Sequence, residues 1–289
     1  MELPFTLSTD PPVTVRQMSR DELGIAIDLA GDEGWNPGLY DAETFWEADP
    51  GGFFALEQDG RVIGTVSVVR YGDGFAFGGL YVLRPEYRGR GIGYALQQEF
   101  TLPFAGSRNL GIDGVFGMRS RYASAGFLFA HRNVRFEGSG GGAAPAGVIP
   151  LEEMSFEAVA DYDRPFFPGP REAFLRAFLS QPDAIGYAVA SGEGDLAGYG
   201  LARPCRTGYK VGPLFADTPA VAERLFRALS AAVPGEPVFL DVPEPNGDAV
   251  ALAARHGMRE VFGTARMYSR SVPALPLDRI YGITTFELG

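Results

Sequence analysis

The chain has 289 residues, of which 46% are hydrophobic and 21% charged, so its composition is that of a globular protein and its length predicts two domains. Its 25 Lys and Arg residues against 36 Asp and Glu give a net charge of −11, which argues against a nucleic-acid-binding protein because phosphate backbones are bound by clustered cations. One cysteine and two histidines argue against a disulfide framework and against a metal site built from these residues, so we expect no metal.

The sequence also bears on where the protein is found. No apolar run approaches the roughly 20 residues that a membrane-spanning helix needs, so we expect no membrane partner. Residues 1–12 have neither the basic nor the long apolar segment of a secretory signal. These features favour a cytoplasmic protein.

Hydrophobic patterns predict an α/β first half, in which helices cover a mixed sheet. The expected strands lie at residues 13–18, 53–56, 62–69, 75–83, 110–115 and 127–137. The expected helices lie at residues 23–30, 41–49, 92–100 and 120–125, with a loop at residues 31–38 after the first helix. We expect Pro103 to end the third helix, and the Asp-Gly pair at residues 59–60 predicts a type I′ hairpin turn.

The same order of elements recurs after a flexible stretch. Residues 138–147, GSGGGAAPAG, have the composition of a linker. Beyond them the expected strands lie at residues 185–190, 196–203, 209–215 and 237–242, with helices at residues 172–179, 219–232 and 247–256 and a turn at residues 192–195. We therefore expect a first domain at residues 1–137, the linker at residues 138–147 and a second domain at residues 148–289, as two copies of one α/β unit.

A loop rich in arginine and glycine, Arg88-Gly89-Arg90-Gly91-Ile92-Gly93, joins the strand at residues 75–83 to the next helix. Alternating glycines let the backbone approach a bulky anion, while the arginines and the positive end of the helix attract it. The spacing matches neither the dinucleotide fingerprint nor the P-loop. From these residues alone, a pyrophosphate site and a glycine-rich turn with exposed arginines both stay open.

The stretch LYVLRPEYRGRGIGYAL, residues 80–96, resembles the signature V-x-P-x-[YF]-[QR]-[GR]-x-G-[IL]-G of the GCN5-related N-acetyltransferase (GNAT) family. The resemblance covers residues 13–137 in element order and implies tandem acyl-CoA N-acyltransferase folds. It implies that the loop holds the pyrophosphate of the cosubstrate acetyl-CoA, and that a bulged strand holds its pantetheine arm and thioester. The cofactor-binding residues implied in this way are Tyr81, Val82, Leu83, Arg88, Gly89, Arg90, Gly91, Ile92 and Gly93.

A second motif, RYASAGF, contains Tyr122. In the resembled family a tyrosine at this place stands near the departing sulfur, so we expect Tyr122 to protonate the thiolate as a general acid. The alternative is that its ring only packs on the cofactor or the sheet. The sequence departs from the family at Val115, where an asparagine is common.

The general base is not evident from the sequence. The strand at residues 75–83 contains no acid, so the common strand-borne glutamate is absent. Glu33 and Asp113 are the two candidate general bases. Glu33 lies in the loop after the first helix, which in the resembled family lines the acceptor site, and Asp113 lies at a strand end. For both, the alternatives are a solvated carboxylate and proton transfer through water.

The second half does not repeat the phosphate loop. Asp217 and Pro219 stand where glycines and arginines are expected, and a carboxylate there would repel a pyrophosphate. We expect a degenerate domain without CoA chemistry that shapes the acceptor site or an interface, such as that of a homodimer. The pairing resembles a subgroup with LDGVP-like and YRN[IL]R-like segments, which match GIDGV at residues 111–115 and HRNVR at residues 131–135.

These features together predict an acetyl-CoA-dependent N-acetyltransferase that acts by direct attack of a primary amine, which we expect to be a small molecule. One alternative is an acyl-CoA-binding sensor or scaffold without turnover. Another is an acyltransferase that uses a longer acyl-CoA.

Overall fold

The computed structural model describes residues 1–192 and 195–289 of the chain. The strands before residue 140 are β1 Phe5–Leu7, β2 Val13–Gln17, β3 Phe53–Gln58, β4 Arg61–Tyr71, β5 Phe75–Leu83, β6 Asn109–Val115 and β7 Leu128–Ser139. The later strands are β8 Ile149–Pro150, β9 Ile185–Ala190, β10 Leu196–Pro204, β11 Tyr209–Ala216, β12 Pro237–Pro243, β13 Arg259–Tyr268 and β14 Ile280–Gly282. The helices are α1 Leu23–Asp32, α2 Asp41–Trp46, α3 Ile92–Ala95, α4 Leu102–Ala105, α5 Arg119–Ser124, α6 Phe156–Asp163, α7 Glu172–Leu179, α8 Pro219–Ala232 and α9 Gly247–Arg255.

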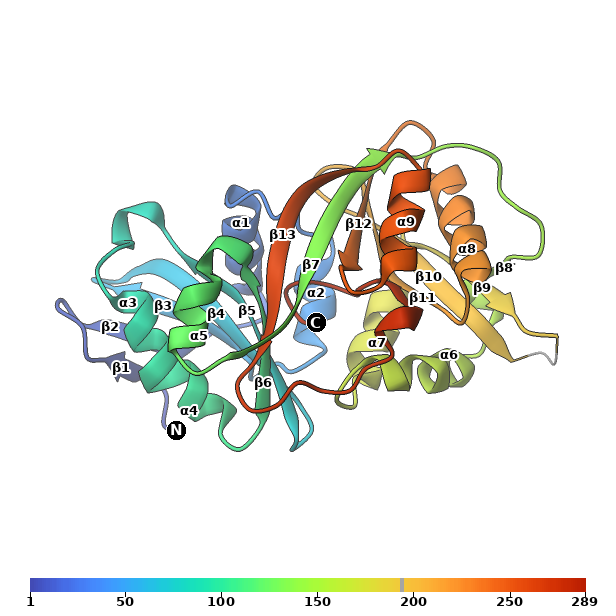
Figure 1. Cartoon of the computed structure of the whole chain (residues 1–289). Coiled ribbons are helices and arrows are strands. Elements are labelled where there is room, and N and C mark those ends of the chain that lie inside the picture. Colours follow the sequence, from blue (N-terminus) through green and yellow to red (C-terminus); the bar gives the residue numbers. More distant parts are fainter. Residues whose placement is uncertain (193–194) are drawn as a thin grey trace.

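All of these strands join one mixed sheet of 14 strands within the described residues. Its order is β1-β2-β3-β4-β5-β6-β13-β7-β12-β11-β10-β9-β8, with β14 paired to β11. β13 therefore lies between β6 and β7, and β7 pairs on its other side with β12 (Figure 1). The two halves thus exchange their last long strands, β7 and β13, and the sheet is continuous between the halves.

Helices cover both faces of the sheet. In the N-terminal half, residues 1–137, the helical segment α3–α4 and α5 pack on one face, while α1 and α2 pack on the other. In the C-terminal half, residues 148–289, α8 and α9 cover one face and α6 and α7 the opposite one. α2 and α7 lie next to each other (Figure 1). Phe45 of α2 and Phe174 of α7 contact each other in a single buried core, which we call the shared interior.

The local elements agree well with their expected positions. Asp59 and Gly60 both have positive φ, 51° and 72°, as a type I′ turn requires. The prediction that Pro103 ends its helix is wrong, because the helix passes through a π-helical turn, Leu96–Thr101, and Pro103 is accommodated in the first turn of α4. The expected linker begins inside β7, and the expected turn at residues 192–195 lies partly outside the described residues.

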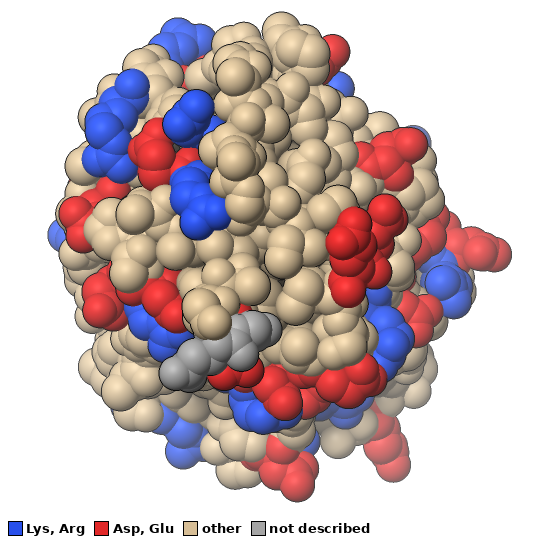
Figure 2. All heavy atoms as spheres, turned by 90° about the vertical axis from the view of Figure 1, so that its right-hand side faces the viewer, with Lys and Arg blue, Asp and Glu red and all other residues tan. Residues whose placement is uncertain are grey.

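Surface charge is mixed on the outer side of the C-terminal half. Figure 2 shows this side, where acidic and basic side chains alternate around an uncharged centre. The ion pairs between Arg255 and Glu223 and between Arg279 and Asp217 belong to this half. Neighbouring charges of opposite sign therefore compensate each other locally.

Candidate active site

β5 and β6 separate midway along their length. Their parallel pairing ends at Gly78 and Ile112, so the rest of β5 diverges from β6. At the same point β5 contains a bulge opposite β4, where Leu80 has a φ of 45° and its carbonyl accepts a 2.9 Å hydrogen bond from the Thr65 hydroxyl. The bulge thus begins one residue before the segment from Tyr81 to Leu83 for which it was expected. We call this opening between the strands the split.

The two faces of the split differ in character. Tyr81 and Leu83 pack on the face that carries α3, α4 and α5, whereas Leu80 packs into the shared interior. The Tyr81 hydroxyl donates a hydrogen bond to the Gly93 carbonyl in α3, so the strand and the loop are fixed to each other. Val82 pairs with Thr65 of β4 and lies in the same segment. The structure therefore brings together the strand and loop residues that the resemblance implies.

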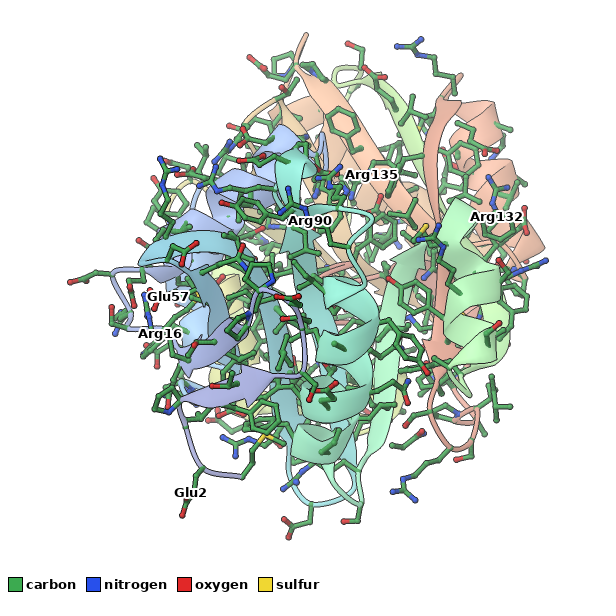
Figure 3. All side chains as sticks on the ribbon, turned by 90° about the vertical axis from the view of Figure 1, so that its left-hand side faces the viewer. Glu2, Arg16, Glu57, Arg90, Arg132 and Arg135 are labelled. Carbon is green, nitrogen blue, oxygen red and sulfur yellow. The ribbon has the colours of Figure 1, made fainter. Side chains whose placement is uncertain are left out.

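The arginine- and glycine-rich loop forms a tight turn before α3. Gly89 and Gly91 have φ values of 76° and 79°, a left-handed conformation that glycine adopts without strain. Arg90 donates a 2.7 Å hydrogen bond to the Glu86 carbonyl and stacks on the Tyr87 ring, 5.3 Å from its centroid. Figure 3 shows Arg90 on this loop, next to the start of α3. Ile92 is the first residue of α3, so the loop offers two arginines and a helix start to an anion.

Tyr122 lies on α5, on the same face of the sheet as Tyr81. Its ring covers the backbone of Gly114 in β6, where a Cβ atom would lie 2.3 Å from a ring carbon. Burial raises the pKa of Tyr122, and both burial and the neighbouring Tyr122 raise the pKa of Tyr81. Both phenols are therefore protonated at neutral pH, as a proton donor to a leaving thiolate must be.

Glu33 is the C-cap residue of α1 and forms an ion pair with Arg88 of the loop. Arg88 also donates a 2.8 Å hydrogen bond to the Leu83 carbonyl. The contact links the end of α1 to the phosphate-side loop, so the Glu33 carboxylate is already engaged by a cation. Its role as a base stays a prediction.

Asp113 lies in a buried network between the two halves. Its carboxylate is 2.5 Å from Arg266 Nη2 and accepts hydrogen bonds from Asn133 Nδ2 at 2.8 Å and from Thr264 Oγ1 at 3.2 Å. The Asp113 side chain is fully buried. Because both oxygens are occupied, the observed contacts are those of an anchor for β13, and a role as a base stays a prediction.

A residue that the sequence reasoning missed lies on the interior side of the split. Glu287, near the end of the chain, places its backbone carbonyl against Gly79, where a Cβ atom would lie 1.9 Å from it. The Glu287 carboxylate is buried and has no hydrogen-bond partner among the described residues. The only signal in the sequence is an acidic residue within an otherwise uncharged C-terminal segment, ITTFELG.

The corresponding opening in the C-terminal half is filled by the chain itself. β11 and β12 pair in parallel only as far as Val211 and Leu240, and β14 then pairs with β11 from Leu214 to Phe215. Gly282 of β14 lies against both neighbouring strands, with its Cβ position 2.9 Å from the Leu240 side chain and 3.2 Å from the Val211 carbonyl. Backbone of the chain itself therefore occupies this second opening.

The region before α8 likewise differs from the phosphate loop. The Thr218 hydroxyl caps α8 by accepting a hydrogen bond from Val221 N at 3.3 Å. Asp217 pairs with Arg279 and accepts a 2.7 Å hydrogen bond from the Tyr162 hydroxyl. Side chains of the protein thus occupy the positions at which the N-terminal half presents a loop to an anion.

Among residues 1–192 and 195–289, no group of three His, Cys, Asp or Glu side chains is placed to hold a metal ion. Over the same residues, no helix is both long and apolar enough to span a bilayer.

Comparisons with known proteins agree with this geometry. Residues 16–101 match the model of the acetyltransferase (GNAT) family, and residues 159–282 match that of an acetyltransferase (GNAT) domain. The chain is 30% identical over 279 residues to the holothin acyltransferase of Pseudoalteromonas sp. (strain SANK 73390), covering 96% of this chain and 94% of the relative.

Solved structures share the whole fold. A Pyrococcus horikoshii protein, provisionally named an acetyltransferase, superposes with a TM-score of 0.82 at 22% identity, covering 100% of this chain and 99% of that one. A tandem GNAT protein from the clavulanic acid biosynthesis pathway superposes with a TM-score of 0.64 at 14% identity, covering 91% and 99%. The two family matches and the full-length acyltransferase relative show that this chain is a two-domain member of the GNAT family of acyltransferases.

Proposed function

We propose that this acyltransferase moves an acetyl group from acetyl-CoA to a primary amine of a small molecule, in one direct step at the split of the N-terminal half. The observation that carries the proposal is the position of Tyr122 beside Tyr81, on the face of the split that also bears the arginine–glycine loop. A thioester held there would have its sulfur next to a buried, protonated phenol.

The donor side supports CoA as the cosubstrate. The loop from Arg88 to Gly93 would hold the pyrophosphate, and the free edge of β5 at Tyr81, Val82 and Leu83 would bond to the pantetheine arm and to the carbonyl oxygen as negative charge develops on it. The holothin acyltransferase supports acyl transfer without fixing the acyl group. An acetyl group suits the site because Leu80 and the chain near Glu287 already occupy the interior beyond Gly79.

The acceptor side supports a small molecule rather than a protein. The loop after α1 is fastened to the turn between β10 and β11, with a bridge between Gly38 and Cys205 and two 2.9 Å hydrogen bonds between Asn36 and Thr207. The Trp35 carbonyl accepts further hydrogen bonds from Arg135 at 2.8 Å and Lys210 at 3.1 Å. These contacts join the two halves around the interior side of the split, which supports a compact amine rather than a protein as the acceptor.

In this proposal the first domain, residues 1–137, carries the chemistry and the segment at residues 148–289 closes the acceptor side without binding CoA. The exchange of β7 and β13 and the filling of the second opening by β14 support this division of labour.

The test is CoA release by the purified chain with acetyl-CoA and a panel of primary amines that includes benzylamine and aniline. We expect turnover with at least one amine and faster turnover with acetyl-CoA than with succinyl-CoA. Faster turnover with succinyl-CoA would support the longer donor. Tight calorimetric binding of acetyl-CoA without turnover on any amine would support a sensor, and no binding would refute the proposal.

A further inference from the structure

Two side chains at the split have buried polar atoms without partners. Both carboxylate oxygens of Glu287 and the hydroxyl of Ser67 lack a hydrogen bond within the described part of the chain. Glu287 is 3% exposed and Ser67 is 0% exposed. A carboxylate buried without a hydrogen bond is energetically unfavourable, so its retention calls for a physical reason.

The two residues that carry these atoms both lie next to Gly79 of β5. Ser67 is the direct cross-strand partner of Gly79, and the backbone of Glu287 lies against Gly79 from the interior side. Gly79 is the first residue of β5 beyond its pairing with β6. The Glu287 carboxylate is therefore within one side-chain length of the split, on the side opposite Tyr122.

The segment that carries Glu287 is held at both ends. Ile283 N donates a 2.9 Å hydrogen bond to the Asp241 carbonyl just after β14. The Leu288 carbonyl accepts a 3.2 Å hydrogen bond from the Tyr71 hydroxyl, and Leu288 N bonds to Thr285 Oγ1 at 2.9 Å. The backbone of Glu287 is thus fixed, so its carboxylate is a placed group rather than part of a loose tail.

Three buried cations from three strands influence Glu287: Arg135 of β7, Arg203 of β10 and Lys210 of β11. Asp241 neutralises Arg135, at 2.6 Å, and Asp41 neutralises Arg203, at 3.0 Å.

Lys210 instead donates to the Trp35 carbonyl, and burial lowers its pKa. Cys205, the remaining titratable group of this cluster, is kept as a neutral thiol because burial raises its pKa. Glu287 and Lys210 therefore each lack an ion-pair partner among the described residues, and no ion pair joins the two.

We propose that Glu287 is the general base of the reaction, accepting a proton from the incoming ammonium group on the interior side of the split while Tyr122 acts on the opposite side. This inference rests on the proposed N-acyltransferase function. In a substrate complex the N–H groups of the amine would supply the hydrogen bonds that Glu287 and Ser67 lack.

Protons and electrons balance over the proposed transfer. Glu287 takes one proton from the ammonium group, and the freed nitrogen lone pair attacks the thioester carbonyl to form the C–N bond. The C–S bond then breaks, and the sulfur takes its proton from Tyr122. The second proton of the nitrogen passes through solvent to restore Tyr122, and Glu287 releases its proton to water.

The test compares Glu287→Gln with the wild-type chain, using acetyl-CoA with the best alkylamine and the best arylamine of the panel. With the alkylamine, which is protonated at pH 7, kcat/KM is expected to fall on the order of 100-fold or more. With the arylamine, which is already neutral, the fall should be at least tenfold smaller. The pH profile of kcat/KM for the wild-type chain should fall at acidic pH, and Glu287→Gln should lack this fall. Glu287→Asp should keep a higher rate than Glu287→Gln.

Two controls separate this role from a structural one. Glu236→Gln changes an exposed glutamate that makes no ion pair with any described residue, and it should leave both rates unchanged. Calorimetric binding of acetyl-CoA should match the wild-type chain in Glu287→Gln, and thermal unfolding should show that this variant is folded and no less stable than the wild-type chain. If that variant does not fold, Glu287→Asp and the wild-type pH profile carry the same comparison.

If Glu287→Gln keeps rates within twofold of wild type, or loses activity equally with both amines, Glu287 is not the general base. Either result would leave the acyltransferase function intact. A wild-type chain that turns over no amine would instead refute the function itself and the base with it.

Discussion

Asp113 of β6 and Arg266 of β13 are direct cross-strand partners and form a 2.5 Å ion pair between the two halves. Arg135 of β7 and Asp241 of β12 are partners in the same way, at 2.6 Å. The two pairs lie on either side of the contact between β7 and β13, so each half supplies one aspartate and one arginine. The exchanged strands are therefore locked by two equivalent buried pairs.

The first prediction concerns this lock. Asp113→Asn leaves the Arg266 charge buried without a counter-ion, and we expect it to lower the free energy of unfolding by about 3 kcal/mol. Urea denaturation measures the change, and Asp241→Asn should show a similar loss. The folded fraction of Asp113→Asn should keep kcat within a few-fold of wild type. A kcat loss of 100-fold in folded protein would instead make Asp113 the base.

The second prediction concerns Tyr122. Tyr122→Phe removes the proposed proton donor but keeps the ring that covers Gly114, so kcat should fall about 100-fold while the affinity for acetyl-CoA stays the same. Steady-state kinetics and calorimetry measure the two quantities. Tyr187→Phe, in β9 of the other half, is a matched control that should change neither. An unchanged kcat would leave Tyr122 with a packing role only.

The third prediction tests the phosphate loop. Gly91 and Gly235 have nearly the same φ, 79° and 80°, and a Cβ atom at either position meets nothing within 4 Å. Alanine at each should cost the same 1–2 kcal/mol or so of backbone strain. Only Gly91→Ala should raise the Kd for acetyl-CoA, by about tenfold, since only that loop is proposed to hold the pyrophosphate. Equal Kd values for the two variants would argue against the site.

The fourth prediction is a pH dependence of stability. Burial, with a smaller contribution from Arg266, lowers the pKa of His131 to about 4. The unfolded chain protonates this histidine near pH 6.5, so the folded state loses stability as pH falls from about 6.5 towards 4. The loss should reach at most about 3 kcal/mol, and His131→Gln should flatten the curve over this interval. Urea denaturation of both chains at a series of pH values gives the free energy of unfolding. The difference between the two curves separates the contribution of His131 from that of the carboxylates.

Local features of this protein could be predicted from sequence because neighbouring residues determine them. The turn at Asp59, the loop around Gly91 and the helix α7 all lie where periodicity and turn chemistry place them. The helix α6 was missed, although Ser155 caps it by accepting a hydrogen bond from Ala158 N at 3.2 Å.

The long-range features could not be predicted in this way. The pairing of β13 with β6 depends on contacts between distant segments, and no periodicity reports them. The position of Glu287 against Gly79 has the same origin, since it follows from the path of the chain after β14. The sequence therefore indicates the proposed donor side of the site, which is one contiguous motif, but not the proposed acceptor side, which draws on residues of both halves.

β14 makes the two folds unequal partners. One keeps an opening beside its bulged strand, whereas the other closes the matching opening with its own backbone. A titration of the chain with CoA should accordingly saturate at one molar equivalent, despite the tandem architecture. β14 also leads into the segment that contacts Gly79 beside the proposed site. A change that separates β14 from β11 should therefore lower catalysis in the opposite half.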